Sequence, residues 1–187
     1  MTAWQADADL VVVGSGVAGL TTALEARDAG LRVLVVTKDG ADAGSTRWAQ
    51  GGIAVVLEDG HEPGDSVDRH VADTLTASAG LAEPASVAAI LADGPAAVAA
   101  LRRRGAVFDP ADDSAGSGTG PATGGLALAR EGGHTAFRVV HAGGDATGAE
   151  VERALLAEVC RSGRAGIPML TGHAAVEVIR LGGDRGP

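Results

Sequence analysis

A glycine-rich turn near the start of the chain constrains its fold more than any other feature. Gly14, Gly16 and Gly19 form the pattern Gly-x-Gly-x-x-Gly. The apolar run 10–13 precedes this turn directly, and residues 17–29 follow it with apolar positions at helical spacing. A continuous apolar run of this length is typical of a parallel strand that is buried on both faces. The sequence therefore predicts a strand, a tight turn and a helix.

A second apolar run, residues 33–36, completes a βαβ unit over residues 9–38, and Gly30 is placed to end the helix between the strands. In such a unit the first glycine makes the turn, the second lets the backbone approach a pyrophosphate, and the third lets the helix pack closely against the strand. The N-terminus of the helix supplies N–H groups to the phosphates. The predicted dinucleotide-binding residues are Gly14, Ser15, Gly16, Val17, Ala18 and Gly19.

The pattern leaves the identity of the dinucleotide open. The second strand of such a unit usually ends with an acidic residue that binds ribose hydroxyls. This chain has Thr37 and Lys38 at that point, and Asp39 follows. A cation at Lys38 is compatible with the 2′-phosphate of NADP. It is equally compatible with FAD, if Lys38 approaches the phosphate or the ribose and other groups bind the hydroxyls.

Charge and composition exclude several classes of partner. The formal charge of −9 argues against nucleic acid and anionic lipid, which both favour basic surfaces. We expect no membrane span, because no run approaches the roughly 18 to 20 apolar residues that one needs. Asp7 and Asp9 near the N-terminus argue against a signal peptide. Cys160 is the only cysteine, which fits a reducing cytoplasm, and we expect it to be a small buried residue on a helix face.

Histidine spacing gives no indication of a metal site. His61, His70 and His173 share no ligand spacing with cysteines or carboxylates, so we predict none. The glycine-rich stretch 114–125 has two interpretations, a loop whose backbone approaches a ligand or a compositional bias.

The rest of the chain reads as a mixture of helices and short strands. We expect a helical segment over 65–104, in which Pro84 and Pro95 each begin a helix and a break falls near 93–95. Thr147 and Glu150 form a capping-box pattern that starts a further helix. Strands are expected at 126–130, 137–141, 167–170 and 174–179. Together these elements predict one α/β domain with a parallel central sheet.

Several motifs after the βαβ unit are specific. The segment 44–54 contains Ser-Thr-x-x-Ala-Gln-Gly-Gly, and residues 130–134 read Arg-Glu-Gly-Gly-His. His70-x-x-Asp73-Thr74, Gly105-x-x-Phe108-Asp109 and the run from His141 to Val151 accompany them. In these motifs the chain resembles the flavoprotein superfamily of fumarate reductases and succinate dehydrogenases, and most closely its L-aspartate oxidases. The resemblance covers residues 9–180, about the first third of the usual length in that family.

The resemblance implies a Rossmann-like FAD-binding domain, incomplete here, without its C-terminal part and capping domain. FAD would contact the segment 44–54, and the backbone of Val176 would meet the adenine. Membrane-associated members link FAD covalently to a histidine at the position of Ser45, so noncovalent FAD is implied. Hydroxyl and amide groups in the segment can hydrogen-bond the flavin edge, and its glycines let backbone lie against the ring. The implied flavin contacts are Ser45, Thr46, Ala49, Gln50, Gly51 and Gly52, together with Lys38.

The resemblance also implies a substrate, L-aspartate, on the side of the loop 109–135. Glu131 would lie near the ammonium group of the amino acid, unless it is a surface residue paired with Arg130. His134 would orient the site or be solvated, while Arg138 and His141 would serve the structure. Oxygen or fumarate would accept the electrons, and quinolinate synthase would consume the iminoaspartate product.

The catalytic residues of the family lie in segments after Pro187, so the expected activity is that of the longer enzyme. The alternatives are a non-catalytic FAD-binding fragment and a fumarate reductase-like dehydrogenase.

Overall fold

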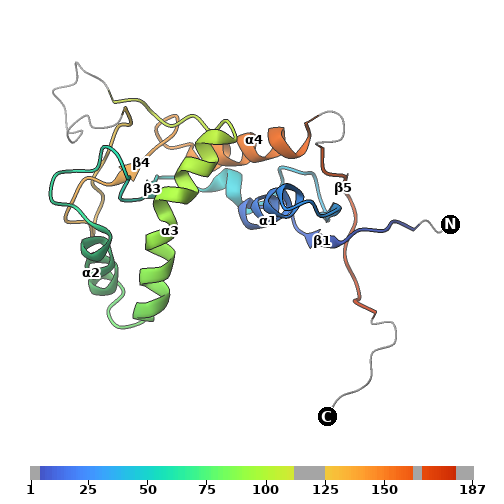
Figure 1. The fold of residues 1–187 in the computed structure, drawn as a ribbon, viewed down its shortest axis with the longest axis horizontal. Helices are drawn as coiled ribbons and strands as arrows, with labels where there is room; N and C mark the ends of the chain where they lie inside the picture. The colour runs from blue at the N-terminus through green and yellow to red at the C-terminus, as the bar shows by residue number, and fades with distance from the viewer. Residues whose placement is uncertain (1–4, 112–124, 162–165, 180–187) are drawn as a thin grey trace, which may run out of the picture. The chain divides into compact units, whose positions relative to one another are not determined.

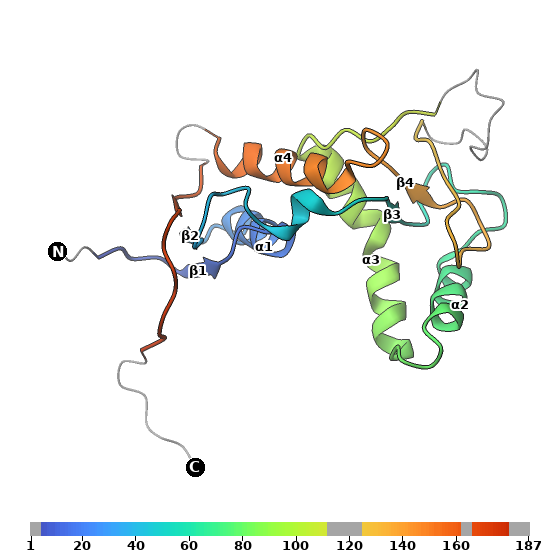
Figure 2. The ribbon, with the colours of Figure 1, turned by 180° about the vertical axis from the view of Figure 1, so that it is seen from behind.

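The computed structural model describes residues 5–111, 125–161 and 166–179 (Figures 1 and 2). It divides into two compact units. The first combines residues 1–45 with 156–187, and the second comprises residues 46–155. The glycine-rich stretch 114–125 lies outside the described residues apart from Gly125.

The first unit contains a parallel sheet with the strand order β1-β2-β5. β1 (Leu10–Val13) and β2 (Val33–Val36) pair in register from Leu10 opposite Val33 to Val13 opposite Val36. β5 (Met169–Leu170) pairs with the second half of β2. Helix α1 (Val17–Asp28) connects β1 to β2 and packs against them (Figure 1). The predicted α/β fold, parallel sheet and βαβ unit are therefore confirmed.

Side-chain burial explains why α1 lies where it does. Leu20, Ala23 and Leu24 are fully buried on one face of the helix. Gly30 follows the helix with a φ of +88°, the left-handed conformation that glycine adopts most readily, as expected for a C′ residue.

The prediction that β1 is buried on both faces is wrong. Val12 is 8% exposed, but Val11 is 52% and Val13 is 66% exposed. Successive side chains of a strand point to opposite faces, so the exposed valines share the face opposite Val12. Within the described residues nothing covers that face.

The last predicted strand, 174–179, is also wrong. These residues form no regular secondary structure, and Val176 and Val178 are more than 90% exposed. A strand exists through hydrogen bonds to a neighbour, and in the described chain no strand pairs with 174–179. The predicted strand 167–170 is reduced to the two residues of β5.

The second unit is built from helices around a small apolar core. Helices α2 (Val67–Ala77) and α3 (Pro84–Arg103) lie side by side in both views (Figures 1 and 2). β3 (Ile53–Ala54) pairs antiparallel with β4 (Val139–Val140). A short 3₁₀ helix, η1 (Ser45–Trp48), begins with the last residue of the first unit's N-terminal segment. The chain returns to the first unit after Leu155, within α4 (Thr147–Val159). The core residues are Val55, Leu57, Val98, Ala106, Phe108, Leu126, Leu128, Val140, Ala142 and Ala154.

The predicted break near 93–95 is wrong, because α3 runs without interruption through Pro95. Glu83 caps its first turn, with its carboxylate accepting from the N–H groups of Ala85 and Ser86. A proline inside a helix removes one backbone hydrogen bond. Val98 is buried in the core beyond Pro95, and we attribute the continuation of the helix to this packing.

α3 also bears on the expectation that the chain has no membrane span. By length and composition it is apolar enough to cross a membrane, with a mean hydropathy of 1.5 and 11% of that window buried. The sequence was expected to contain no such segment. One helix of this kind is weak evidence, since helices of soluble proteins meet the same criterion.

Four local predictions fail in the remaining segments. The strand expected at 137–141 is reduced to β4, and 126–130 contributes only isolated bridges. α4 begins at Thr147 as predicted, but not through a capping box, because the Thr147 hydroxyl accepts from the N–H of Ala142. The Glu150 carboxylate accepts from the N–H of Val107 instead of reaching back along the helix. Cys160 is exposed rather than buried, because α4 ends one residue before it.

Candidate cofactor and substrate site

The glycine turn lies at the carboxyl edge of the parallel sheet. The N–H of Gly14 donates to the carbonyl of Val36 at 2.8 Å, and Gly14 has a φ of +105°. A Cβ on Gly19 would lie 2.1 Å from the carbonyl oxygen of Gly14. Gly14 is therefore required for the turn, as predicted. Gly19 is required chiefly for contact with the turn, and the strand that was predicted as its neighbour lies further away, with Val12 Cγ1 at 3.4 Å.

The start of α1 fits an anion. Gly16 is its N-cap and has no side chain to bond the N–H groups, and the first turn carries no acidic residue. The partial positive charge of the helix N-terminus is thus not compensated by a carboxylate in that turn. Val17, in this turn, is 44% exposed. Such a terminus at the carboxyl edge of a parallel sheet is a site for a dinucleotide pyrophosphate.

Ser15 and Lys38 have different roles at this edge. The hydroxyl of Ser15 is buried and donates to the hydroxyl of Thr37 at 3.2 Å. Its side chain therefore ties the turn to the end of β2. Lys38 is the next residue, and it is exposed at the same edge. Its contact with the cofactor stays a prediction.

The predicted flavin segment is held against the start of α4 in the second unit. The carbonyl of Ala49 accepts from the N–H of Gly148 at 3.1 Å. A Cβ on Gly148 would lie 2.0 Å from the carbonyl oxygen of Thr46, so only glycine fits there. The N–H of Gly51 donates to Asp145 Oδ1 at 2.7 Å. The side chains of Ala49 and Gln50 are exposed.

The two glycines of this segment differ in what they face. A Cβ on Gly52 would lie 2.5 Å from the carbonyl oxygen of Val140 and 2.8 Å from His141 Nε2. Gly52 is therefore required for contact with β4 itself, a reason that the sequence did not suggest. Gly51 has a φ of +73°, and its nearest neighbour would be Glu131 Oε1 at 3.8 Å.

Glu131 thus lies beside the flavin segment, on a turn distant from it in sequence. Its Oε1 is 3.0 Å from His141 Nε2, and its side chain is 49% exposed. The alternative of a pair with Arg130 finds no support, because the Arg130 guanidinium lies over the ring of Phe137 at 5.4 Å. The structure therefore brings Glu131, Gly51 and His141 together.

His134 contacts a buried ionic network. Its Nδ1 lies 3.2 Å from Arg138 Nη1, and its ring lies 5.3 Å from that of His70. Arg138 is fully buried and donates to Asp65 at 2.6 and 3.0 Å and to Asp73 at 2.6 Å. A guanidinium can only donate, so Nδ1 of His134 accepts and the ring proton lies on Nε2. Arg138 has the structural role that the sequence predicts.

The network shifts the pKa values of Asp73 and His70. Burial raises the pKa of Asp73, but hydrogen bonds from Thr135 and Arg138 outweigh it and hold that pKa at about 2. Burial, reinforced by the charge of Arg138, lowers the pKa of His70. Asp73 also accepts from the N–H and the hydroxyl of Thr135 at 2.9 and 2.8 Å. The turn that carries Glu131 and His134 is therefore anchored at its far end.

Four residues of this arrangement were not predicted to have a site role: Asp109, His141, Asp145 and Gly148. Asp109 accepts from the N–H groups of Gly143 and Gly144 at 2.8 and 3.0 Å. All four lie in motifs that carry the family resemblance, but the motifs alone do not show which groups they contact. The contacts of Ser45 and Val176 with FAD stay predictions.

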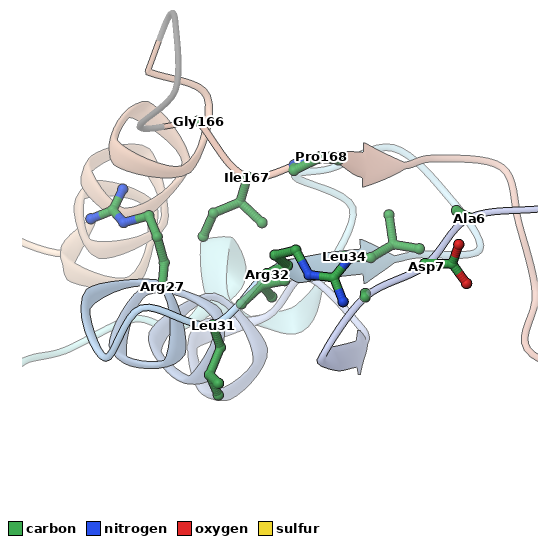
Figure 3. A pocket seen from close by; sticks show the side chains of 11 residues that line it. Ala6, Asp7, Arg27, Leu31, Arg32, Leu34, Gly166, Ile167 and Pro168 are labelled. Carbon is green, nitrogen blue, oxygen red and sulfur yellow. The ribbon is translucent and has the colours of Figure 1, made fainter.

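A pocket of about 360 Å³ opens at the other edge of the sheet (Figure 3). Most of its lining residues precede β1, β2 or β5 or begin β2, so it lies at the amino edge, away from the glycine turn. Arg27 and Arg32 line it, and both pair with carboxylates, Arg27 with Glu158 at 3.0 Å and Arg32 with Asp9 at 2.7 Å. Ligands of open parallel sheets bind at the carboxyl edge, so this pocket is not the cofactor site. Among the described residues, no group of three or more His, Cys, Asp or Glu is arranged to hold a metal ion.

Comparison with known proteins identifies the class. The model of a family described as the FAD binding domain matches residues 9–185, and the chain belongs to this family. The chain is a homologue of L-aspartate oxidases. It is 52% identical to the L-aspartate oxidase of Streptomyces coelicolor over 83% of this chain and 24% of that protein. Identity to the L-aspartate oxidase of Mycobacterium tuberculosis is 48% over 96% of this chain and 31% of that protein.

Solved structures agree with the fold. The Mycobacterium smegmatis Sdh1 complex superposes with a TM-score of 0.74 and 31% identity, over 88% of this chain and 27% of that chain. An E. coli quinol fumarate reductase superposes with a TM-score of 0.64 at 24% identity, over 80% and 23% of the two chains, which supports the fold alone. The chain spans about a quarter to a third of the length of these relatives.

Proposed function

We propose that this chain is the FAD-binding part of an L-aspartate oxidase, that it holds FAD without a covalent bond, and that Glu131 recognises the substrate ammonium. Identities of 52% and 48% to L-aspartate oxidases support the substrate, against 31% to the Sdh1 complex. Ser45 supports a dissociable cofactor, because a hydroxyl is not the imidazole to which the membrane-associated relatives attach FAD.

The position of Glu131 carries this proposal. Its carboxylate lies 3.8 Å from the position of a Cβ on Gly51, within the segment expected to contact the flavin. A carboxylate there attracts the ammonium of L-aspartate, whereas succinate has no cation to offer. Glu131 thus favours L-aspartate over succinate, the dicarboxylate that lacks the ammonium group.

The open, uncapped start of α1 and the exposed groups of the segment 44–54 support FAD as the cofactor. Bound FAD supplies an acceptor for the hydride that leaves the substrate carbon. The start of α1 would hold the pyrophosphate, and the groups of Thr46, Gln50 and Gly51 would face the flavin. The substrate is converted to iminoaspartate, with oxygen or fumarate as the final acceptor, and quinolinate synthase consumes the product. Within this proposal the location is cytoplasmic, which the single cysteine supports.

A second candidate function is FAD binding without turnover. The chain spans 24% and 31% of two L-aspartate oxidases that it matches. The general acid or base of the reaction would then come from segments that the relatives have in addition. This candidate predicts that residues 9–180 hold FAD but support no oxidation of L-aspartate even when they are joined to the additional segments of a relative.

The test of substrate choice uses a chimera in which residues 9–180 replace the matching part of the Streptomyces coelicolor enzyme. We expect it to form hydrogen peroxide with L-aspartate and not with succinate. Glu131→Gln should raise KM for L-aspartate about ten-fold or more, because hydrogen bonds to charged groups contribute about 1.5–3 kcal/mol. Glu58→Gln, an exposed carboxylate outside the site, is the matched control. An unchanged preference for L-aspartate in Glu131→Gln would remove Glu131 from the proposal.

A further inference from the structure

Glu131 lies on an exposed turn, and one side chain contacts its carboxylate. We propose that this residue, His141, is a positioning residue that holds Glu131 against Gly51 and thereby contributes to the preference for L-aspartate. This inference rests on the function proposed above. His141 was expected to serve only the structure.

The geometry places His141 beside both Glu131 and the flavin segment. Its Nε2 lies 3.0 Å from Glu131 Oε1 and 2.8 Å from the position of a Cβ on Gly52. Glu131 Oε1 in turn lies 3.8 Å from that of Gly51. The imidazole and the carboxylate therefore lie side by side along the Gly51–Gly52 backbone, and the imidazole is the less exposed of the two, at 21% against 49%.

The backbone of His141 is held by a strand on one side and by a distant loop on the other. The carbonyl of His141 accepts from the N–H of Asp109 at 2.8 Å, and β4 precedes it directly. The Asp109 carboxylate also accepts from the next two glycine N–H groups, which fixes the chain that follows. Glu131 begins a short turn, in which its carbonyl accepts from the N–H of His134 at 3.2 Å. A rigid donor thus holds a long side chain on a solvent-exposed turn.

The consequence for binding is entropic. A free, exposed glutamate samples many rotamers, and ordering it when the substrate binds costs free energy. A hydrogen bond from His141 restricts the Glu131 side chain before the substrate binds, and so reduces this cost on binding. The bond uses an N–H on Nε2, which a neutral or a charged imidazole can supply. Glutamine also offers an N–H donor, whereas alanine offers none.

The chimera described above tests the inference through two variants, His141→Ala and His141→Gln. For His141→Ala we expect KM for L-aspartate to rise about five-fold with kcat within about two-fold, because the ordering of Glu131 is lost while its charge remains. We expect inhibition by succinate to be unchanged, because succinate does not use Glu131. His141→Gln should recover most of the affinity. FAD content and melting temperature serve as controls for folding.

Two results would overturn the inference and leave the proposed function standing. One is an equal loss in His141→Ala and His141→Gln, which would mean that the ring acts by packing on Gly52. The other is a rise in KM for L-aspartate from His141→Ala that is equally large in the Glu131→Gln background. If His141 acts through Glu131, His141→Ala should have little effect once Glu131 is replaced. If Glu131→Gln itself leaves the preference for L-aspartate unchanged, the proposed role of Glu131 is wrong, and the inference about His141 is rejected with it.

A spectroscopic measurement tests the contact between His141 and Glu131 independently of activity, which matters if His141→Ala loses FAD. In ¹⁵N-histidine NMR of the 187-residue chain, Glu131→Gln should shift the Nε2 resonance of His141, while Glu58→Gln should leave it unchanged. Equal spectra for Glu131→Gln and the wild type would overturn the inference.

Discussion

At the scale of single residues, the site depends on positions where the missing Cβ of a glycine makes room for another backbone. Gly19 clears the carbonyl of Gly14, Gly148 clears that of Thr46, and Gly52 clears that of Val140. The first of these follows from the dinucleotide pattern and was predicted. The other two depend on which segments meet in three dimensions, and the sequence around them shows only a Gly-Gly pair and a capping-box pattern.

A comparison of Gly52→Ala with Gly51→Ala tests the clearance at Gly52. Gly52→Ala should lower the free energy of unfolding by about 2–3 kcal/mol, because the new methyl group would lie 2.5 Å from the carbonyl oxygen of Val140. Gly51→Ala has space and should cost only the left-handed backbone conformation, about 1–2 kcal/mol. Urea unfolding followed by circular dichroism measures both. A Gly52→Ala variant as stable as the wild type would show that β4 and the flavin segment do not meet as described.

The network around Arg138 makes a prediction about acid stability. Asp73 has a folded pKa of about 2, below its ordinary value of 3.8. A lowered carboxyl pKa stabilises the fold above the unfolded value, and this stability is lost as the pH falls from about 4 to 2. Asp73→Asn should remove this part of the pH dependence and lower the free energy of unfolding at pH 7 by about 2 kcal/mol. Denaturation at pH values between 2 and 7 measures it, and an unchanged slope below pH 4 would contradict the assignment.

At the scale of elements, strong local signals were predictive and weak ones were not. The strand–turn–helix–strand unit was predicted with its strand bounds, because apolar runs, glycines and a capping position agree over residues 9–38. Helix α2 and the start of α3 also follow from local signals, the latter because Glu83 and Pro84 favour a helix N-terminus. The short strands β3, β4 and β5 depend on partners distant in sequence. The helix break predicted at Pro95 does not occur, because the packing of Val98 keeps α3 continuous.

Pro95 gives a prediction for α3. Pro95→Ala should restore the hydrogen bond that proline cannot donate and raise the free energy of unfolding by about 1–3 kcal/mol. Ala96→Gly, in the same turn and exposed, is the matched control and should lower it by about 1 kcal/mol. Chemical unfolding of the two variants checks the account, and a loss of stability in Pro95→Ala would show that the proline is preferred where it stands.

At the scale of the whole molecule, the residues predicted to contact FAD fall into two sets, and each compact unit holds one set. The pyrophosphate end, at the start of α1, belongs to the first unit, and most of the flavin segment belongs to the second. The sequence predicted the first set from a general pattern and the second only through a family resemblance. The hydrogen bond from Gly51 to Asp145 and the contact of His141 with Glu131 were not predicted, because each joins positions from separate motifs.

FAD binding by the purified 187-residue chain tests the central claim most directly. After incubation with FAD and removal of the excess, we expect a flavin absorption band with about one FAD per chain. Acid precipitation should release all of it into solution, since Ser45 offers no imidazole. Gly19→Ala should lose the band, and Glu58→Gln should keep it. A folded chain that retains no FAD would contradict the account, and so would flavin that stays with the acid precipitate.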